Sequence, residues 1–484
     1  MRCRRSIAAA RRLLPAVAMS CLLAAGATGP AQAAEAGGLD GRGLGPLWAL
    51  PFAGVLLSIA LGPLLTPRLW HHHYGKIAAF WTACSMLALV ARFGGGAAAD
   101  VLLHTALLEY LPFVLLLLAL FTVTGGLRLE GPFTGTPASN TLLLAAGTGL
   151  ASIAGTTGAA MLLVRPLVRA NAWRRRRAHT LVFFVFLVAN IGGSLTPLGD
   201  PPLFLGFLKG VPFFWPTVHL LPMFLLAAAV LLVAFYAVDS AYARGEDGPP
   251  PAVPAGRRRL RLEGGRVNLP LLALVLLAVL ASGLWSGGVA VEGRGVALTW
   301  GGLLRDATLL AVTAASWRLT PRETRLANDF GWGPMAEVAK LFAAIFVTIA
   351  PVIAMLQAGP DGAFAPVVAL VTRPDGTPHD AAYFWATGIL SSFLDNAPTY
   401  LVFFNLAGGD PAVLTTTLAG TLAAISAGAV FMGANTYIGN APNFMVRAVA
   451  EEMGVRMPGF FAYMAWSAAA LLPLFALLTA VFFT

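Results

Sequence analysis

Two acidic residues, Asp200 and Asp395, stand inside apolar stretches of the kind that span a membrane. Asp200 lies between Thr-Pro-Leu-Gly and two prolines, and Asp395 is followed by Asn-Ala-Pro. Proline removes a backbone donor and glycine weakens a helix, so we expect both helices to break here. Broken backbone at membrane depth is tolerated where it lines a cavity, and an ionisable group there indicates a functional site.

The chemistry available at these breaks is that of cation binding. Carboxylates beside freed carbonyl groups form an oxygen-rich, negative site that can replace the water shell of a small hard cation. A carboxyl group in low dielectric also holds its proton more tightly. One group can then hold a proton or a sodium ion in turn, which is the minimal mechanism of proton/sodium exchange. Polar side chains near the breaks are candidate ligands: Thr156, Thr157, Asn190, Thr196, Asn396, Asn435, Thr436, Asn440 and Asn443.

Each of these residues also has a purely structural interpretation. Asp200 precedes two prolines, so it could be a helix N-cap with proline at the first helical position. Asp395 and Asn396 could form only the turn at a hairpin tip. The threonines and the other asparagines could simply satisfy the backbone groups that the breaks set free.

The interrupted segments occur twice in the chain. The stretch from Thr196 to Phe204 aligns with the stretch from Thr436 to Phe444, 240 residues further on. The same offset places Ser152 on Ser392. Paired, glycine- or proline-interrupted apolar segments in corresponding positions of two halves indicate the binding site of a secondary transporter.

Composition sets the class of protein that must position these residues. Of 484 residues, 58% are hydrophobic and 11% are charged, which is typical of a polytopic membrane protein. We predict an all-α fold with about ten membrane passes and two re-entrant hairpins, since roughly 20 apolar residues span a bilayer. The net charge of +10 does not indicate nucleic acid, because the arginines cluster in short loops. The predicted passes cover residues 46–65, 77–93, 103–124, 181–208, 217–238, 269–285, 297–316, 335–356, 414–449 and 460–483.

The chain divides into two halves behind an N-terminal signal. An arginine-rich start, an apolar run and Ala31-Gln32-Ala33 predict a signal peptide over residues 1–33, although an uncleaved first span would look similar. A proline- and arginine-rich stretch predicts a cytoplasmic linker between the halves. The predicted divisions are a first half, 34–240, with hairpin 141–168 and broken helix 181–208; the linker, 241–267; and a second half, 268–484, with hairpin 383–406 and broken helix 414–449.

Loop charge predicts the orientation. With both hairpins counted as re-entrant, the arginine clusters, including the run from Arg174 to Arg177, fall on one side. The positive-inside rule makes that side cytoplasmic, so both mature termini are expected in the periplasm of a bacterium and the chain in its inner membrane. The two repeats are then inverted relative to one another.

Other kinds of active site are not indicated. There is no HExxH, P-loop or GxSxG motif, so we expect neither an enzyme nor a nucleotide-driven pump. We expect no cofactor. The run from His71 to His73 lacks a second ligand cluster, so no metal site beyond that of a transported cation is predicted.

Over residues 190–206, 391–400 and 433–443 the chain resembles the ion transporter superfamily. That superfamily includes NhaD-type sodium/proton antiporters, arsenite exporters and citrate or dicarboxylate carriers. The chain most resembles its bacterial branch of sodium:proton antiporters and citrate transporters, over about residues 103–483. The resemblance implies a dimerising scaffold domain, a transport domain of two hairpins and two broken helices, and elevator-type movement.

The same resemblance implies roles for individual residues. Asp200 and Asp395 would be the coupling carboxylates, and the hairpin tips together with residues 435–443 would supply the other ligands. Dicarboxylate carriers have Ser-Asn-Thr at their hairpin tips, whereas this chain has Gly-Thr-Thr-Gly and Asp-Asn-Ala-Pro. This difference favours a cation over a carboxylate.

We therefore predict a secondary transporter that exchanges sodium for protons and forms a homodimer in the bilayer. Three other interpretations stay open at this stage. A carrier of citrate or a dicarboxylate would share the fold, and so would an arsenite-type exporter. A non-transport membrane scaffold would make the breaks mere kinks.

Overall fold

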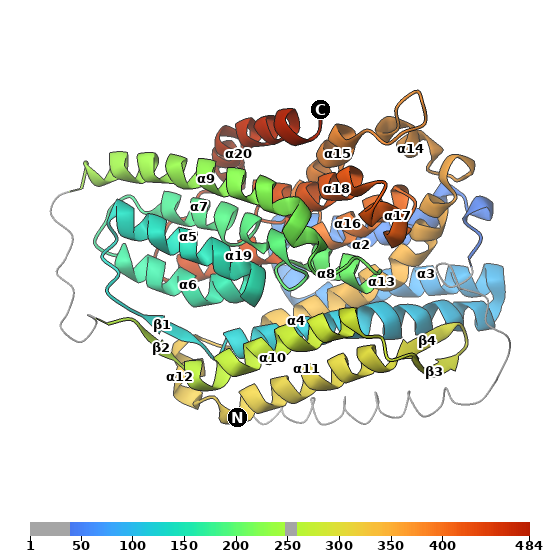
Figure 1. Cartoon of the computed structure of the whole chain (residues 1–484), viewed down its shortest axis with the longest axis horizontal. Coiled ribbons are helices and arrows are strands. Elements are labelled where there is room, and N and C mark those ends of the chain that lie inside the picture. Colours follow the sequence, from blue (N-terminus) through green and yellow to red (C-terminus); the bar gives the residue numbers. More distant parts are fainter. Residues whose placement is uncertain (1–38, 247–258) are drawn as a thin grey trace.

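The computed structural model describes residues 39–246 and 259–484. The predicted signal peptide lies outside these residues, as does the middle of the predicted linker. The protein is an all-α polytopic membrane protein with two short β-ribbons (Figure 1). Seven helical stretches within the described residues are long and apolar enough to cross a membrane. The membrane class predicted from composition is thus confirmed.

One of these stretches contains two passes. It runs from Pro67 to Thr124, and its 58 residues would extend about 85 Å as a single helix, far more than the roughly 30 Å of a bilayer core. The chain turns at Gly94, whose φ of 84° lies in the left-handed region that glycine adopts freely. The helix α3 (Pro67–His104) therefore reverses at Gly94, and its second part continues as helix through a π-helical turn, η4 (Thr105–Tyr110), into α4 (Leu111–Thr124).

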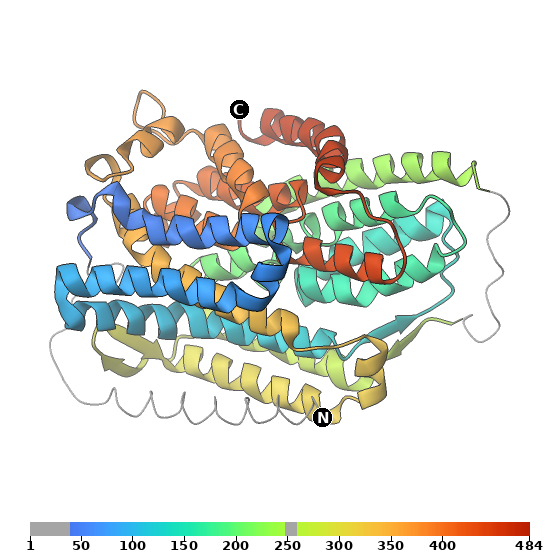
Figure 2. The ribbon, with the colours of Figure 1, turned by 180° about the vertical axis from the view of Figure 1, so that it is seen from behind.

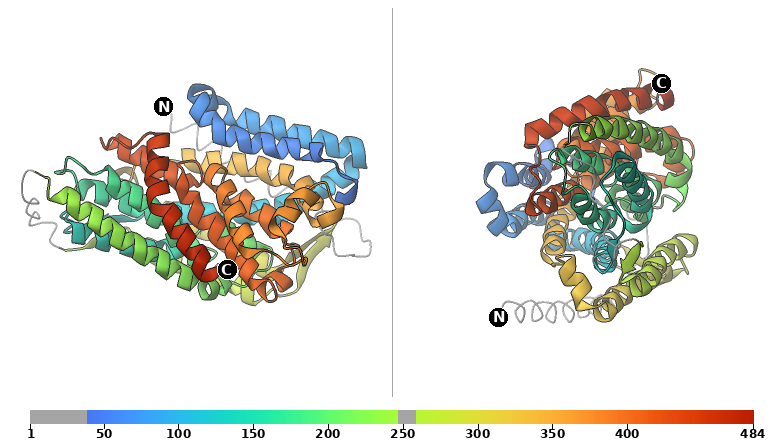
Figure 3. Two further views of the ribbon diagram at one scale, coloured as in Figure 1. Left: turned by 90° about the horizontal axis from the view of Figure 1, so that it is seen from above. Right: turned by 90° about the vertical axis from the view of Figure 1, so that its left-hand side faces the viewer.

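Helices outside the repeated segments form what we call the scaffold group. Figure 2 shows α2, α3 and α4 side by side, and Figure 3 places α2 and α3 along one flank of the molecule. The helices α10 and α11 pack on each other and on α4, and α13 packs on α2, α3 and η4. The scaffold group comprises α2 (Leu50–Leu65), α3, η4, α4, α10 (Gly265–Leu284), α11 (Trp300–Leu319) and α13 (Gly333–Gln357).

The remaining long elements surround the repeated segments and form what we call the site group. Its helix α7 is buried on all sides, whereas α10 of the scaffold group exposes most of its surface. The site group comprises α5 (Pro137–Ala154), α6 (Thr156–Ala170), α7 (Ala178–Leu187), η5 (Ile191–Leu195), α8 (Pro201–Leu208), α9 (Trp215–Ala243), α15 (Asp380–Phe393), α16 (Asn396–Leu406), α18 (Ala419–Met432), η8 (Gly433–Asn435), α19 (Ala441–Glu452) and α20 (Phe460–Phe482). Short helices α12 (Arg322–Ala327), α14 (Ala365–Val371) and α17 (Pro411–Thr415) connect the longer ones.

The first hairpin is built from α5 and α6, which meet at Gly155 with a φ of 77°. Asn140, near the start of α5, exchanges two side-chain hydrogen bonds of 2.9 Å with Asn171, just after α6. The segment therefore enters and leaves at the same end. Its first arm has 18 residues and is about 27 Å long. It begins four residues before the predicted start at residue 141, because the helix starts at Pro137 behind a Thr136 cap.

The second hairpin is built from α15 and α16, which break between Phe393 and Asn396. The rings of Tyr383 and Phe403, near the outer ends of the two arms, lie 6.3 Å apart, so this segment also returns to the end from which it came. Figure 1 shows the first hairpin on the left of α8 and the second on its right. Their tips meet at the N-terminus of α8.

Two other predicted elements differ in detail. The predicted pass at residues 297–316 forms α11 but is not among the seven apolar stretches, since it contains Arg305 and Asp306, paired at 2.8 Å. In the predicted linker, α9 continues to Ala243, and the strand β2 (Arg261–Glu263) pairs antiparallel with β1 (Arg128–Glu130). The second ribbon joins β3 (Val289–Gly293) and β4 (Val296–Thr299), between α10 and α11.

Candidate functional site

Asp200 lies where the two hairpin tips and the two broken helices meet. Its Oδ1 accepts hydrogen bonds from Thr156 Oγ1 at 2.9 Å and from Asn440 Nδ2 at 3.1 Å, and its Oδ2 accepts one from Asn396 Nδ2. The Asp200 side chain is buried, with the residue only 2% exposed. A buried carboxylate is costly unless it is hydrogen-bonded, and here three donors from three elements supply those bonds.

The two acids differ in what their side chains do. Asp200 occupies the N-cap position of α8, but its carboxylate makes no capping bond to the helix. Asp395 occupies the N-cap position of α16 and does cap it, accepting a bond from Ala397 N at 3.1 Å. The capping interpretation therefore describes the geometry of Asp395 and not that of Asp200. Asp395 is half-buried and directly precedes Asn396, which contacts Asp200.

Buried asparagines connect Asp200 to the backbone of both broken helices. Asn440 also donates to Asn190 Oδ1 at 3.2 Å, and Asn190 donates to Asn443 Oδ1 at 2.7 Å. Asn443 in turn donates to the carbonyl oxygens of Gly433 and Thr436 at 2.8 and 2.9 Å. Asn190 and Asn443 do not touch the carboxylate. Their bonds replace those that the unwound backbone loses.

The two repeats make equivalent bonds at the breaks. Thr196 donates to the carbonyl of Ser152, and Thr436 donates to that of Ser392, 240 residues further on. The Ser152 hydroxyl bonds Gly192 O, and the Ser392 hydroxyl bonds Met432 O, at the same offset. These pairs hold each hairpin against its broken helix. Thr196 and Thr436 therefore stabilise the two breaks by bonding the hairpins, and neither donates to the Asp200 carboxylate.

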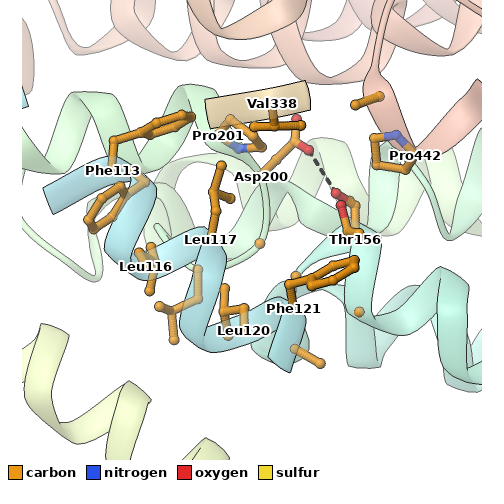
Figure 4. Close-up of a pocket in the computed structure, with 18 of the residues that line it drawn as sticks. Phe113, Leu116, Leu117, Leu120, Phe121, Thr156, Asp200, Pro201, Val338 and Pro442 are labelled. Atoms are coloured by element: carbon orange, nitrogen blue, oxygen red, sulfur yellow. Dashed lines mark hydrogen bonds between the residues drawn. The ribbon is translucent and has the colours of Figure 1, made fainter. Parts of the chain in front are cut away.

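A pocket of about 110 Å³ opens beside Asp200, between the site group and the scaffold group. One wall is α4, whose residues Phe113, Leu117 and Phe121 face the pocket (Figure 4). Val338 of α13 and Pro442 of α19 lie across from them. None of the described residues lining the pocket is a lysine, arginine or histidine. The surroundings are apolar, with Asp200, Thr156 and Thr157 as the polar contributions from side chains.

The other predicted site residues lie around this centre. Thr157 lines the pocket, whereas Asn435 is half-buried and donates to Ser392 Oγ at 2.9 Å. Two amide oxygens, Asn396 Oδ1 and Asn435 Oδ1, are buried and accept no hydrogen bond from the described residues. Unpaired buried oxygens of this kind are uncommon in native structures, and amide oxygens are ligands that hard cations accept. Among the described residues, no group of three or more His, Cys, Asp or Glu side chains could hold a metal ion, and His71 to His73 lie in α3.

Sequence reasoning did not identify the scaffold wall of the pocket. The α4 and α13 segments look like ordinary membrane passes, and only their position in space brings them to Asp200. It also gave Ser152 and Ser392 no role, although both occur at the common offset and bond the breaks. The shared offset of 240 residues is the sequence feature from which a common role of the two serines could have been predicted.

Comparison with known proteins agrees with this architecture. A family model described as "Putative citrate transport" matches residues 41–483, which include both hairpins, both broken helices and every residue around Asp200. No curated protein matches the chain. Because the family model covers nearly all of the 484 residues, the chain belongs to this citrate transport family within the ion transporter superfamily, and it is a membrane transporter.

Proposed function

We propose that the protein is a sodium/proton antiporter in which Asp200 binds a proton and a sodium ion alternately. The observation that supports this most is the buried Asp200 carboxylate at the end of an apolar pocket without cationic side chains. A proton neutralises the carboxylate directly, and sodium does so by contact with its oxygens. Since one negative charge offsets one positive charge, the two ions compete for the same group.

The asparagines around Asp200 suit such an exchange. A carboxamide has a donor end and an acceptor end, and Asn396 and Asn440 both direct their NH2 groups at the carboxylate. In our proposal these donors stabilise the empty, ionised site. Rotation of the Asn396 amide would direct its unpaired Oδ1 to an arriving cation, so that carboxylate and amide oxygens bind sodium together.

A citrate carrier is the second candidate, because the matching family is described by citrate transport. Citrate carries carboxylates that would meet the Asp200 carboxylate and the apolar side chains of α4 in this pocket. Recognition of a carboxylate usually depends on arginine or other charged donors. Citrate would therefore need bound cations to offset the negative charge. This requirement makes the antiporter the better-supported proposal.

Sodium-dependent proton movement in proteoliposomes tests the proposal. We expect an imposed sodium gradient to change the internal pH with no organic acid present, and Asp200→Asn to abolish the change while the protein still inserts. Asp361→Asn is the matched control, because Asp361 is an exposed acid far from the breaks in sequence. Citrate uptake without sodium-dependent proton movement would reject antiport and favour the carrier.

The proposal also includes the assembly and its placement. We propose a homodimer in a bacterial inner membrane, with the mature termini on the periplasmic side, as loop charge and the resemblance imply. In this proposal the site group is the transport domain, which moves past the scaffold group. The apolar contact of α4 and α13 with the pocket supports this division, because such an interface can slide without breaking many hydrogen bonds.

A further inference from the structure

A second pocket lies away from Asp200, at the turn between α6 and α7. Its volume is about 510 Å³, and its walls include the four consecutive arginines Arg174 to Arg177, together with Arg456, Tyr242 and Trp466. We call it the arginine pocket. The positive-inside rule accounts for arginines in a short loop, but it does not require them to surround a cavity.

The most buried of these arginines, Arg174, is already paired with an acid. The guanidinium of Arg174 is fully buried and pairs with Asp239, which also accepts bonds from Asn140 at 2.9 Å and from His179 at 2.7 Å. Asp239 therefore offsets the charge of Arg174 and not that of the outer arginines. The Nε of Arg174 is buried and has no acceptor among the described residues. This nitrogen is covered by other atoms, so it is an unused donor within the wall and does not open into the pocket.

The backbone of the same turn holds an anion of the chain itself. The successive N–H groups of Arg175 and Arg176 donate to the carboxylate of Glu246 at 2.8 and 3.1 Å. Consecutive N–H groups that converge in this way form an anion-binding concavity. Glu246 lies just past the end of α9, at the start of the predicted linker. Its carboxylate therefore occupies the anion-binding concavity that these N–H groups form next to the pocket.

The outer arginines are held in place around the cavity. The guanidinium of Arg176 lies 5.7 Å from the ring centre of Tyr242, and Arg177 donates to Gly454 O at 3.1 Å. Nearby acids have other partners, since Glu451 pairs with Arg447 at 2.9 Å and Glu452 lies 3.7 Å from Arg165. Among the described residues, Arg176, Arg177 and Arg456 thus bring positive charge to the cavity without an ion pair to an acid.

We propose that the arginine pocket binds a phosphate group, supplied by the headgroup of an anionic phospholipid or by a soluble phosphate compound. The guanidinium fork matches phosphate oxygens with two parallel bonds, and several arginines together favour an anion with three or four oxygens. Trp466 adds the amphipathic ring that is common at the level of lipid headgroups. The site is separate from Asp200 and does not depend on which ion is transported.

Native mass spectrometry and thermal unfolding of the purified full-length protein test this site. We expect the wild type to retain phosphatidylglycerol over phosphatidylcholine, or to gain thermal stability with inorganic phosphate. A preference for the lipid alone identifies a headgroup, and stabilisation by phosphate alone identifies a soluble ligand. We expect the pair of substitutions Arg176→Gln and Arg456→Gln to weaken the effect about tenfold, since two charge-assisted contacts are removed.

The control is Arg318→Gln, which removes an exposed arginine from the last turn of α11, outside the pocket. It should bind as the wild type does. The proposal is overturned if the wild type shows neither lipid preference nor stabilisation by phosphate, or if the control loses as much binding as the double variant. The wild-type measurement decides the question even where the double variant does not fold.

Discussion

At the scale of single residues, the site depends on which side chains bond the Asp200 carboxylate. Thr156 and its neighbour Thr157 both lie at the first hairpin tip and both line the pocket, but only Thr156 has a hydrogen bond to Asp200. Sequence reasoning could name both threonines but could not separate them, because one helical position decides which hydroxyl faces the carboxylate. The structure makes that distinction.

The two threonines provide a matched pair of variants. We expect Thr156→Val to weaken the apparent sodium affinity about tenfold, because loss of a hydrogen bond worth roughly 1.5–3 kcal/mol to the ionised carboxylate favours the protonated form, which competes with sodium. Thr157→Val should change the apparent sodium affinity less than about twofold, since Thr157 makes no hydrogen bond to Asp200 in the structure. Sodium-dependent proton flux over a range of sodium concentrations measures both. Equal effects in the two variants would contradict the assignment of Thr156 as the ligand partner.

The charge of Asp395 can be tested separately from the bond by which its side chain caps α16. Asparagine is as good an N-cap as aspartate, so Asp395→Asn keeps the bond to Ala397 N while removing the charge. The family resemblance implies that Asp395 is a second coupling carboxylate, so we expect this variant to abolish exchange with little change in the melting temperature. Asp395→Ala should additionally lower the melting temperature, because a lost cap costs about 1 kcal/mol. Exchange retained in Asp395→Asn but lost in Asp395→Ala would leave Asp395 a structural role only.

At the scale of elements, the broken helices depend on close backbone approaches that glycine permits. A β-carbon at Gly199 would overlap the carbonyl of Gly193, and one at Gly439 would lie 2.5 Å from the carbonyl of Gly433. The two contacts are equivalent at the offset of 240 residues, so the same packing is made in both repeats. Because these glycines have no β-carbon, each unwound segment can pack closely against the end of its own helix.

Alanine at the first of these positions tests the packing. We expect Gly199→Ala to lower the melting temperature and to abolish exchange, because the clash is with rigid backbone and must displace Asp200 next to it. Gly149→Ala is the control: it lies in α5, nothing lies within 4 Å of the added carbon, and alanine favours a helix. Fluorescence-detected thermal unfolding and flux are the measurements. Normal exchange in Gly199→Ala would show that the break tolerates rearrangement.

The breaks could be predicted from the sequence, whereas their bonding could not. Glycine, proline and the 240-residue offset locate the interruptions at residues 155, 196–200, 395 and 436–440, because these residue types act locally on the backbone. The partners of Asp200 come from elements up to 240 residues away, so they follow from tertiary packing. The sequence could not indicate that Asn440 bonds the Asp200 carboxylate whereas Asn190 and Asn443 bond each other and the backbone.

At the scale of the whole molecule, two polar contacts between described residues join the site group to the scaffold group. Lys209, just after α8, pairs with Glu109 of the π-helical turn η4, and Gln357 of α13 donates to Asn405 Oδ1 at 3.1 Å. The helix α8 therefore has Asp200 at one end and a link to the scaffold group at the other. Movement of the site group would have to break that ion pair.

Cross-linking tests whether the two groups move. In a background with Cys3, Cys21 and Cys84 all replaced by alanine, we expect cysteines at positions 109 and 209, joined by a short bifunctional thiol reagent, to stop exchange. Cysteines at positions 165 and 452, on α6 and α19 within the site group, should be joined without loss, because the charged ends of Arg165 and Glu452 lie 3.7 Å apart and show that the two positions face each other. The measurement is flux before and after the reagent. Full exchange in the Glu109–Lys209 cross-linked protein would argue against relative movement of the groups.

The β1–β2 ribbon also has a consequence for how the two repeats are connected. In this ribbon Arg128 lies opposite Glu263, and Glu130 lies opposite Arg261. The antiparallel pairing therefore fixes the register of β2 against β1. The strand that precedes α10 is thus hydrogen-bonded to the strand that follows α4, so the first turn of the second half has a fixed position against the first half, independent of the packing of the long helices.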